Sequence, residues 1–176
     1  MKSDKQLFLS HAWKNDDLGR NTHERARYLK DALKQKGWSV WFDEDDMKLN
    51  IDASMISGIE SAEMVLTCLT KEYIKQLNES SFSLRKKNKN CAKEWKYAIA
   101  RNKIVLALVM EPGILSTAWP PGILTMYICD QLYINAIGDD MTQVANDITR
   151  LLSTFGLLPR KKRMFRRLNF RKLVYI

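Results

Sequence analysis

The sequence contains few cysteines and histidines, which argues against a metal or disulfide framework. It has three cysteines, Cys68, Cys91 and Cys129, and two histidines, and no two cysteines form a Cys-x-x-Cys pair. An odd number of widely spaced cysteines is not a disulfide pattern, and it lacks the ligand spacing of a structural zinc site. Cys68 and Cys129 lie in apolar segments, so we expect both to be small buried residues.

Long apolar runs are also missing. No stretch approaches the roughly 20 residues that a membrane-spanning helix needs. The first ten residues, MKSDKQLFLS, lack the apolar core of a signal peptide. We therefore expect a cytoplasmic protein.

Glycine-rich phosphate loops are absent as well. The chain has seven glycines, and neither a Walker loop nor the dinucleotide-binding glycines follow its first apolar run. This absence disfavours an oxidoreductase of the Rossmann type.

The positive charge of the chain is concentrated near its C-terminal end. The formal net charge is +9, and eight of the 29 lysines and arginines lie between Arg160 and Lys172. The rest of the chain has 21 basic residues against 20 acidic ones and is nearly neutral. We expect one domain over 1–158 and a basic, aromatic tail over 159–176. The tail suits an anionic membrane surface, RNA or DNA, a nuclear-import signal, or a solvated end without a partner.

Strand-like and helix-like segments alternate along the domain. Apolar, β-branched or aromatic runs predict strands over 6–10, 38–42, 63–70, 103–110 and 131–136. Helical spacing of apolar residues predicts helices over 22–36, 52–61, 71–77, 93–101 and 144–155. We expect loops over 43–50 and 112–122. Mostly apolar strands that alternate with helices indicate an α/β fold, a flavodoxin-like doubly wound parallel sheet of five strands.

In such a sheet, ligands bind beyond the carboxyl ends of the strands. This rule selects Ser10–Asn21, Asp43–Ile51 and the segment leading into Glu94. Ser10 and His11 are adjacent at the end of a strand and therefore point to opposite sides. That geometry disfavours a Ser-His pair for nucleophilic catalysis.

Three features at this edge have more than one interpretation. Trp13 lies in a polar loop, either as a lid over the sheet edge or as a stacking surface for a base or nicotinamide ring. The acidic run Asp43–Asp46 has no second carboxylate cluster beside it, so it indicates a solvated turn rather than a metal site. Glu94 is either near the start of a helix, where the dipole favours its charge, or an active-site carboxylate.

Several segments resemble the Toll/interleukin-1 receptor (TIR) domain family, and they occur in the same order. LFLSHAW resembles the first box of the family, and GWSVWFDEDDMKLNIDASMISGIESAEMVLTCLTKEYI resembles the stretch from its second strand through its third. NCAKEWKYAI is similar to the Cys-x-x-Glu segment of NAD-cleaving TIR domains. LVMEP, followed by Trp-Pro, is similar to the strand and loop beyond it. The resemblance runs from about Gln6 to Phe155.

The resemblance implies an enzyme that cleaves the bond between nicotinamide and ribose in NAD+. NAD+ would be the substrate, with no separate cofactor and no metal, and the products would be nicotinamide and linear or cyclised ADP-ribose. The resemblance makes Glu94 the catalytic residue and Asp43–Asn50 a gating loop. The residues that it places at the substrate are Ser10, His11, Ala12, Trp13, Asp43, Glu44, Leu49 and Cys91.

The family also implies self-association or binding to other TIR domains, in immune or cell-death signalling. A non-catalytic assembly module is the alternative to the enzyme. Two residues depart from the family pattern. Leu49 stands where Gly or Pro is common, so we expect a stiffer or differently placed loop. Asn90 stands where some members have a tryptophan four residues before the catalytic glutamate.

Overall fold

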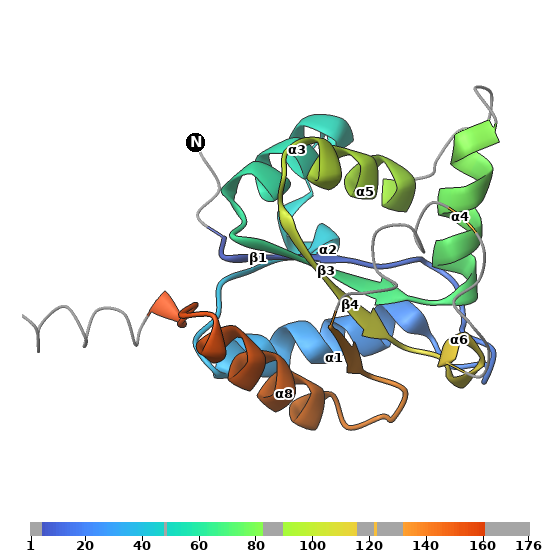
Figure 1. The fold of residues 1–176 in the computed structure, drawn as a ribbon. Coiled ribbons are helices and arrows are strands. Elements are labelled where there is room, and N and C mark those ends of the chain that lie inside the picture. The colour runs from blue at the N-terminus through green and yellow to red at the C-terminus, as the bar shows by residue number, and fades with distance from the viewer. Residues whose placement is uncertain (1–4, 48, 83–89, 116–121, 123–131, 161–176) are drawn as a thin grey trace, which may run out of the picture.

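A five-stranded parallel sheet forms the centre of the protein (Figure 1). The computed structural model describes residues 5–47, 49–82, 90–115, 122 and 132–160. The strands are β1 (Leu7–Ser10), β2 (Val40–Trp41), β3 (Met64–Leu69), β4 (Ile104–Val109) and β5 (Tyr133–Asn135). They lie in the order β2-β1-β3-β4-β5, and every pairing is parallel. The predicted flavodoxin-like architecture is confirmed.

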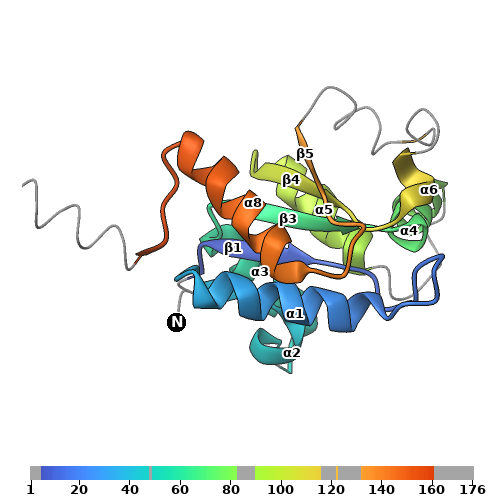
Figure 2. The same cartoon turned by 90° about the horizontal axis from the view of Figure 1, so that it is seen from below.

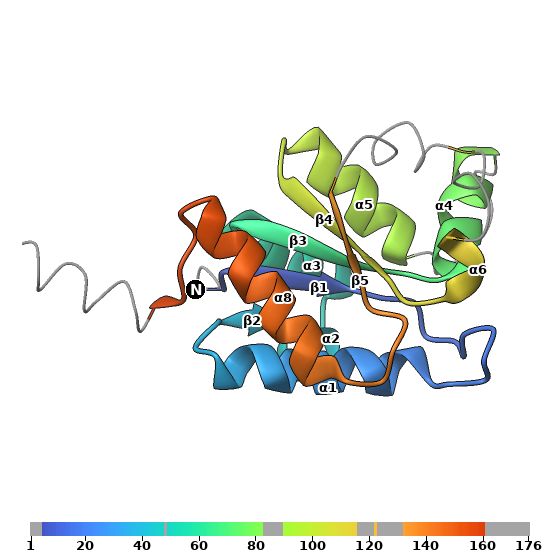
Figure 3. The same ribbon diagram turned by 60° about the horizontal axis from the view of Figure 1, so that its bottom comes forward.

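Helices cover both faces of this sheet. They are α1 (Thr22–Gln35), α2 (Asp43–Asp46), α3 (Ile51–Ser61), α4 (Lys71–Phe82), α5 (Asn90–Ala100), α6 (Pro112–Leu115) and α8 (Met141–Thr154). Figure 1 shows α3 and α5 on one face and α1 and α8 on the other, and Figure 2 shows this second pair from below. In Figure 3, α8 lies beside α1, which it contacts extensively, and α4 packs against α5.

The alternation of side chains along β1 separates two parts of the core. Leu7 and Leu9 pack toward α1 and α8. Phe8 points to the other face, where its ring stacks on Trp41 of β2 with centroids 4.3 Å apart. Because successive side chains of a strand point to opposite faces, Ser10 at the end of β1 lies on the same side as Phe8.

Local sequence fixes where two of the helices near this edge begin. Asn21 before α1 and Asn50 before α3 each accept a hydrogen bond from the backbone N–H three residues later. Gly58 of α3 has a different role. A Cβ atom at this position would lie 2.7 Å from the indole of Trp41, so glycine lets α3 pack directly on that ring.

Some predicted boundaries were wrong. The stretch predicted as an acidic loop begins with the four-residue helix α2, in which Glu44 and Asp45 are exposed to solvent. Helix α5, predicted over 93–101, begins at Asn90, about one turn earlier. The stretch Pro112–Leu115, predicted as irregular, is helix α6.

The predicted burial of Cys68 is confirmed. Cys129, the loop residues 116–121 and the tail after Arg160 lie outside the described residues. Among the helices that the structure describes, none has the length and apolarity that crossing a membrane requires.

Candidate functional site

Two polar side chains at the carboxyl end of β1 lie on opposite sides of the sheet. Ser10 Oγ forms hydrogen bonds with Tyr73 of α4 and Glu94 of α5. The next residue, His11, is hydrogen-bonded instead to His23 of α1. The alternation of the strand thus gives the serine and the histidine different partners, and Ser10 is directed toward a carboxyl group rather than toward an imidazole.

Glu94 is a buried carboxyl group at the end of a short chain of hydroxyl groups. The residue is 7% exposed, and Ser10 Oγ donates a hydrogen bond of 2.5 Å to its Oε2. The Tyr73 hydroxyl lies 2.8 Å from the same Oγ. Because the Ser10 hydrogen is used toward Glu94, Tyr73 is the donor to Ser10. Both hydroxyl groups therefore orient toward the carboxyl group.

The surroundings of Glu94 hold it close to half-ionised at neutral pH. Burial raises the pKa of Glu94 to about 7, because a charged carboxylate loses its hydration there. The Ser10 hydrogen bond lowers the pKa, and the negative charge of Asp43 raises it further. A carboxyl group with such a shifted pKa, at the edge of a doubly wound sheet, is a candidate for catalysis.

The pattern of apolar residues on α5 explains why Glu94 faces inward. Cys91, Trp95 and Ala98 recur at spacings of four and three and are all buried, so the helix packs with this stripe toward the sheet. Glu94 lies on the same stripe. The thiol of Cys91 donates a hydrogen bond of 3.2 Å to the carbonyl oxygen of His11. Burial and the charge of Glu94 raise the pKa of Cys91 well above its usual range, so this thiol is not an activated nucleophile.

Aromatic rings form a wall on the α1 side of β1. Trp13 stacks on His23 with ring centroids 3.9 Å apart, and His11 stacks on Phe42 at 5.1 Å. The indole Nε1 of Trp13 donates a hydrogen bond of 2.7 Å to Oδ2 of Asp43. The ring of His23 and the carboxylate of Asp43 therefore hold the Trp13 side chain in place, although Trp13 is 66% exposed.

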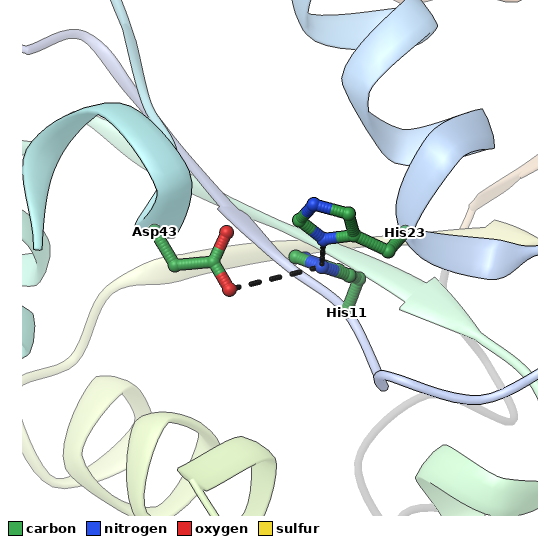
Figure 4. Close-up of side chains that lie close together, drawn as sticks. All are labelled: His11, His23 and Asp43. Carbon is green, nitrogen blue, oxygen red and sulfur yellow. Dashed lines mark hydrogen bonds and ion pairs between the residues drawn. The ribbon is translucent and has the colours of Figure 1, made fainter.

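His11, His23 and Asp43 lie together at the end of this wall (Figure 4). His11 Nε2 is 2.7 Å from His23 Nδ1 and 3.8 Å from Asp43 Oδ2. Burial lowers the pKa of His11 to about 4, the charge of Asp43 opposes this change and His23 adds to it. At neutral pH the ring of His11 is therefore uncharged.

The acidic helix α2 is held against its neighbours by ion pairs. Asp45 Oδ2 lies 3.2 Å from Lys30 Nζ and 2.7 Å from Lys34 Nζ, both on α1. Asp46 lies 2.7 Å from Lys5, which precedes β1. Because these two carboxylates have cations of their own, the four acidic residues of α2 do not act together as one metal site. These ion pairs hold the first half of the expected gating loop in place.

A cavity of about 240 Å³ lies between these two sets of side chains. Its walls come from the ends of β1 and β2, from α2, and from α4 and α5. The lining residues are Leu9, His11, Trp13, Trp41, Asp43, Met47, Gln76, Asn90, Cys91 and Glu94.

The structure brings together most, but not all, of the residues that the sequence placed at the substrate. His11, Trp13, Asp43, Cys91 and Glu94 line the cavity. The other four do not line it: Ser10 lies behind Glu94, Ala12 is buried in the core, Glu44 is near His23, and Leu49 is fully exposed to solvent.

The residues that sequence reasoning missed include Trp41, which lines the cavity, and Tyr73 and His23, which contact Ser10 and His11. Trp41 pairs in register with Phe8, so the alternation of the two strands could have placed it on the Glu94 side. Tyr73 and His23 come from helices, and only the packing of those helices on the sheet brings them to Ser10 and His11. No local sequence pattern predicts such contacts.

Comparison with known proteins assigns the family. A search of curated proteins found no match. A protein-family model of the TIR domain matches residues 7–145, a range that includes all five strands and Glu94. Domains of this family are signalling modules that associate with themselves or with other TIR domains, and some members cleave NAD. The match covers most of the chain, and the protein therefore belongs to the TIR domain family.

Proposed function

We propose that this TIR domain cleaves NAD+ between nicotinamide and ribose, releasing nicotinamide and linear or cyclic ADP-ribose. One observation carries the proposal: a buried glutamate with a raised pKa, held by Ser10, lies in the wall of a cavity that also contains Trp13 and Trp41. The existence of NAD-cleaving members in the family supports it. NAD+ is the substrate, and the proposal requires no separate cofactor.

The residue types suit the reaction. The bond between C1′ of the ribose and the pyridinium nitrogen breaks, and its electron pair neutralises the nicotinamide. The ribose is left with oxocarbenium character, as in glycoside hydrolysis. Water then adds to C1′ and loses a proton, or a second nucleophile of the same molecule closes a cyclic product. Because the nicotinamide ring is already cationic before the bond breaks, its departure requires no general acid. A single carboxylate is then sufficient to stabilise the positive charge on the ribose.

Glu94 acts in its ionised form. A carboxylate shielded from water interacts more strongly with a developing positive charge than one in bulk solvent. The Ser10 and Tyr73 hydroxyl groups hold the carboxylate in one orientation, so little reorganisation is needed when the cation forms. Trp13 offers an exposed aromatic face at the cavity, which suits stacking with the nicotinamide ring.

The size of the cavity agrees with binding one end of the dinucleotide. Cavities for drug-sized ligands hold about 300–1,000 Å³, and this one holds about 240 Å³. We infer that the nicotinamide and its ribose enter the cavity and that the adenosine end lies outside it. Association with a second TIR domain could then cover the exposed end.

The experiment is NAD+ consumption by concentrated protein, with the nucleotide products separated by chromatography. Glu94→Gln should lower the rate at least about 100-fold, the scale of losing one preorganised electrostatic group. The matched control is Glu24→Gln, which changes a glutamate of α1 whose side chain is 54% exposed. Equal consumption by the wild type and Glu94→Gln would contradict the proposed role of Glu94.

A second candidate function is a non-catalytic assembly module. The observation that favours it is a group of exposed apolar side chains after α2, with Leu49 fully exposed, Ile51 48% exposed and Ile56 43% exposed. Large apolar side chains exposed near one another in the sequence are candidates for an interaction site. If crowded wild-type protein leaves NAD+ intact while Leu49→Asp reduces its sedimenting oligomers, the assembly role replaces the enzymatic one.

We further propose that the protein acts in the cytoplasm, in immune or cell-death signalling, and that its basic tail binds an anionic partner. The residues from Arg160 to Lys172 suit an anionic membrane surface or nucleic acid. Flotation with phosphatidylserine vesicles and binding to a labelled oligonucleotide separate these two partners. Removal of the tail should abolish the interaction that these assays detect and leave NAD+ cleavage unchanged.

A further inference from the structure

The only two histidines of the chain lie in contact with each other. His11 follows β1 and His23 lies in α1, yet their ring nitrogens are 2.7 Å apart. Asp43 at the start of α2 is the third member of the group. One ligand atom from each of the three side chains lies within 4.8 Å of the others (Figure 4).

The three ligand atoms lie close together. His11 Nε2 is the nitrogen nearest both His23 Nδ1, at 2.7 Å, and Asp43 Oδ2, at 3.8 Å. In a tetrahedral zinc site with Zn–N bonds of about 2.0–2.1 Å, two ligand nitrogens are about 3.3 Å apart. The imidazole rings therefore need to separate by only about 0.6 Å to admit an ion of this size.

The groups behind the ligand atoms resemble an outer coordination shell. Asp43 Oδ1 already accepts a hydrogen bond from the backbone N–H of Glu44, which leaves Oδ2 facing the histidines. Oδ2 has a second lone pair, so it can keep its bond from Trp13 while binding an ion. The remaining ring nitrogen of His23 lies 3.9 Å from Glu44 Oε2. A carboxylate behind a ligating histidine is the usual outer partner in such sites.

We propose that His11 Nε2, His23 Nδ1 and Asp43 Oδ2 bind one divalent transition-metal ion of the zinc class. Two imidazoles and one carboxylate form the donor set of open zinc sites, with water in the fourth position. Mg²⁺ and Ca²⁺ prefer oxygen ligands throughout, so this set discriminates against them. His11 and Asp43 line the cavity, which provides access for the ion and its water.

The protonation state of the cluster suits metal binding. One proton lies in the hydrogen bond between the two imidazole nitrogens. For both nitrogens to bind the ion, this proton moves to the other ring nitrogen of the histidine that carries it, so each ring stays an intact imidazole. The exchange of tautomers therefore requires no release of this proton to the solvent.

Occupation of the site would link three elements of the fold. His11 belongs to the segment after β1, His23 to α1, and Asp43 to α2. The metal site borders the same cavity as Glu94, but neither Glu94 nor its partners Ser10 and Tyr73 contribute a ligand, so metal binding can be tested apart from the proposed reaction.

The test is a calorimetric titration with Zn²⁺ of the full chain, free of tags and treated with a chelator beforehand. We expect one ion per chain, and no comparable heat with Mg²⁺ or Ca²⁺. His23→Gln should weaken Zn²⁺ binding at least about 100-fold. Loss of an outer-shell partner alone weakens binding by up to about 100-fold, and His23 is a direct ligand. Asp31→Asn is the matched control, since it changes a carboxylate of α1 whose side chain is 54% exposed and should leave affinity unchanged.

A second readout requires no variant. Because the chain has two histidines, nitrogen NMR of the imidazole rings reports this cluster alone, and Zn²⁺ should shift both rings together. Circular dichroism checks that His23→Gln is folded, and Asp43→Asn provides a second ligand deletion. Absence of Zn²⁺ binding to the wild type, or equal binding by His23→Gln, would overturn the site. Neither result depends on whether the protein cleaves NAD+.

Discussion

The stability of the variant Glu94→Gln, relative to that of the wild type, should increase as the pH rises. In the unfolded chain this glutamate ionises near its ordinary pKa of 4.5, whereas in the folded protein burial raises the pKa to about 7. Between these values the folded state retains a proton that the unfolded state releases, so the stability of the wild type falls with rising pH. Glutamine has no proton to lose and is exempt from that decrease.

The structure sets the size of this effect. A difference of about 2.5 pKa units corresponds to on the order of 3 kcal/mol. The advantage of Glu94→Gln over the wild type should therefore grow by about 3 kcal/mol from pH 4.5 to pH 8.5 and then level off. For a domain of this length, that is a relative rise in Tm of roughly 6–12 °C. Glutamine introduces an extra amide hydrogen that can destabilise the variant. This cost does not depend on pH, so it cancels when the stability difference at one pH is compared with that at another.

Denaturant unfolding at several pH values measures this difference. Other titrating groups that face Glu94, among them Asp43 from α2, Tyr73 from α4 and Cys91 from α5, are present in both proteins and cancel to first order. Glu24→Gln serves again as the exposed control and should show no such trend. A stability difference that stays constant across the range would refute the argument that Glu94 is desolvated.

Three further predictions follow from the same site and its surroundings. NAD+ cleavage should rise with pH through a midpoint near 7, because Glu94 acts ionised, and Ser10→Ala should move that midpoint upward by removing the bond that favours the charge; pH–rate profiles measure both, and a lower midpoint in the variant would contradict the reasoning. Trp13→Phe should raise KM about fivefold with little change in kcat, since stacking is retained while the hydrogen bond to Asp43 is lost; steady-state kinetics that show a fall in kcat alone would assign Trp13 another role. Truncation after Arg160 should leave the Tm unchanged, because both hydrogen bonds of this segment to buried Gln6 are retained, whereas removal of 158–160 should cost about 1–3 kcal/mol; thermal unfolding of the two truncated proteins decides the point.

The sequence was most informative where a local pattern repeats. The periods of the apolar residues located the strands and most helices, and the alternation of β1 correctly separated Ser10 from His11. The acidic run at Asp43 was predicted as a loop, whereas in the structure it is a short helix whose carboxylates have partners on other elements. Lys30 and Lys34 of α1 neutralise Asp45, and a single sequence does not reveal that α1 lies beside it.

Contacts between distant helices could not be predicted in the same way. Whether Tyr73 reaches Ser10, or His23 reaches His11, depends on how α4 and α1 rotate about their axes when they pack on the sheet. A change of one residue in either helix would turn the side chain by about 100° and break the contact. Such placements follow from the packed core and not from composition or motifs.

The alternation at the end of β1 also has a consequence for how this domain can diversify. Ser10 extends one group of residues on the α4–α5 side, and His11 extends a different group on the α1 side. Because the strand backbone lies between them, we expect substitutions in one group to leave the side-chain hydrogen bonds of the other in place. The two groups can therefore be gained, lost or exchanged separately in descendants of this sequence, while the sheet that carries them stays the same.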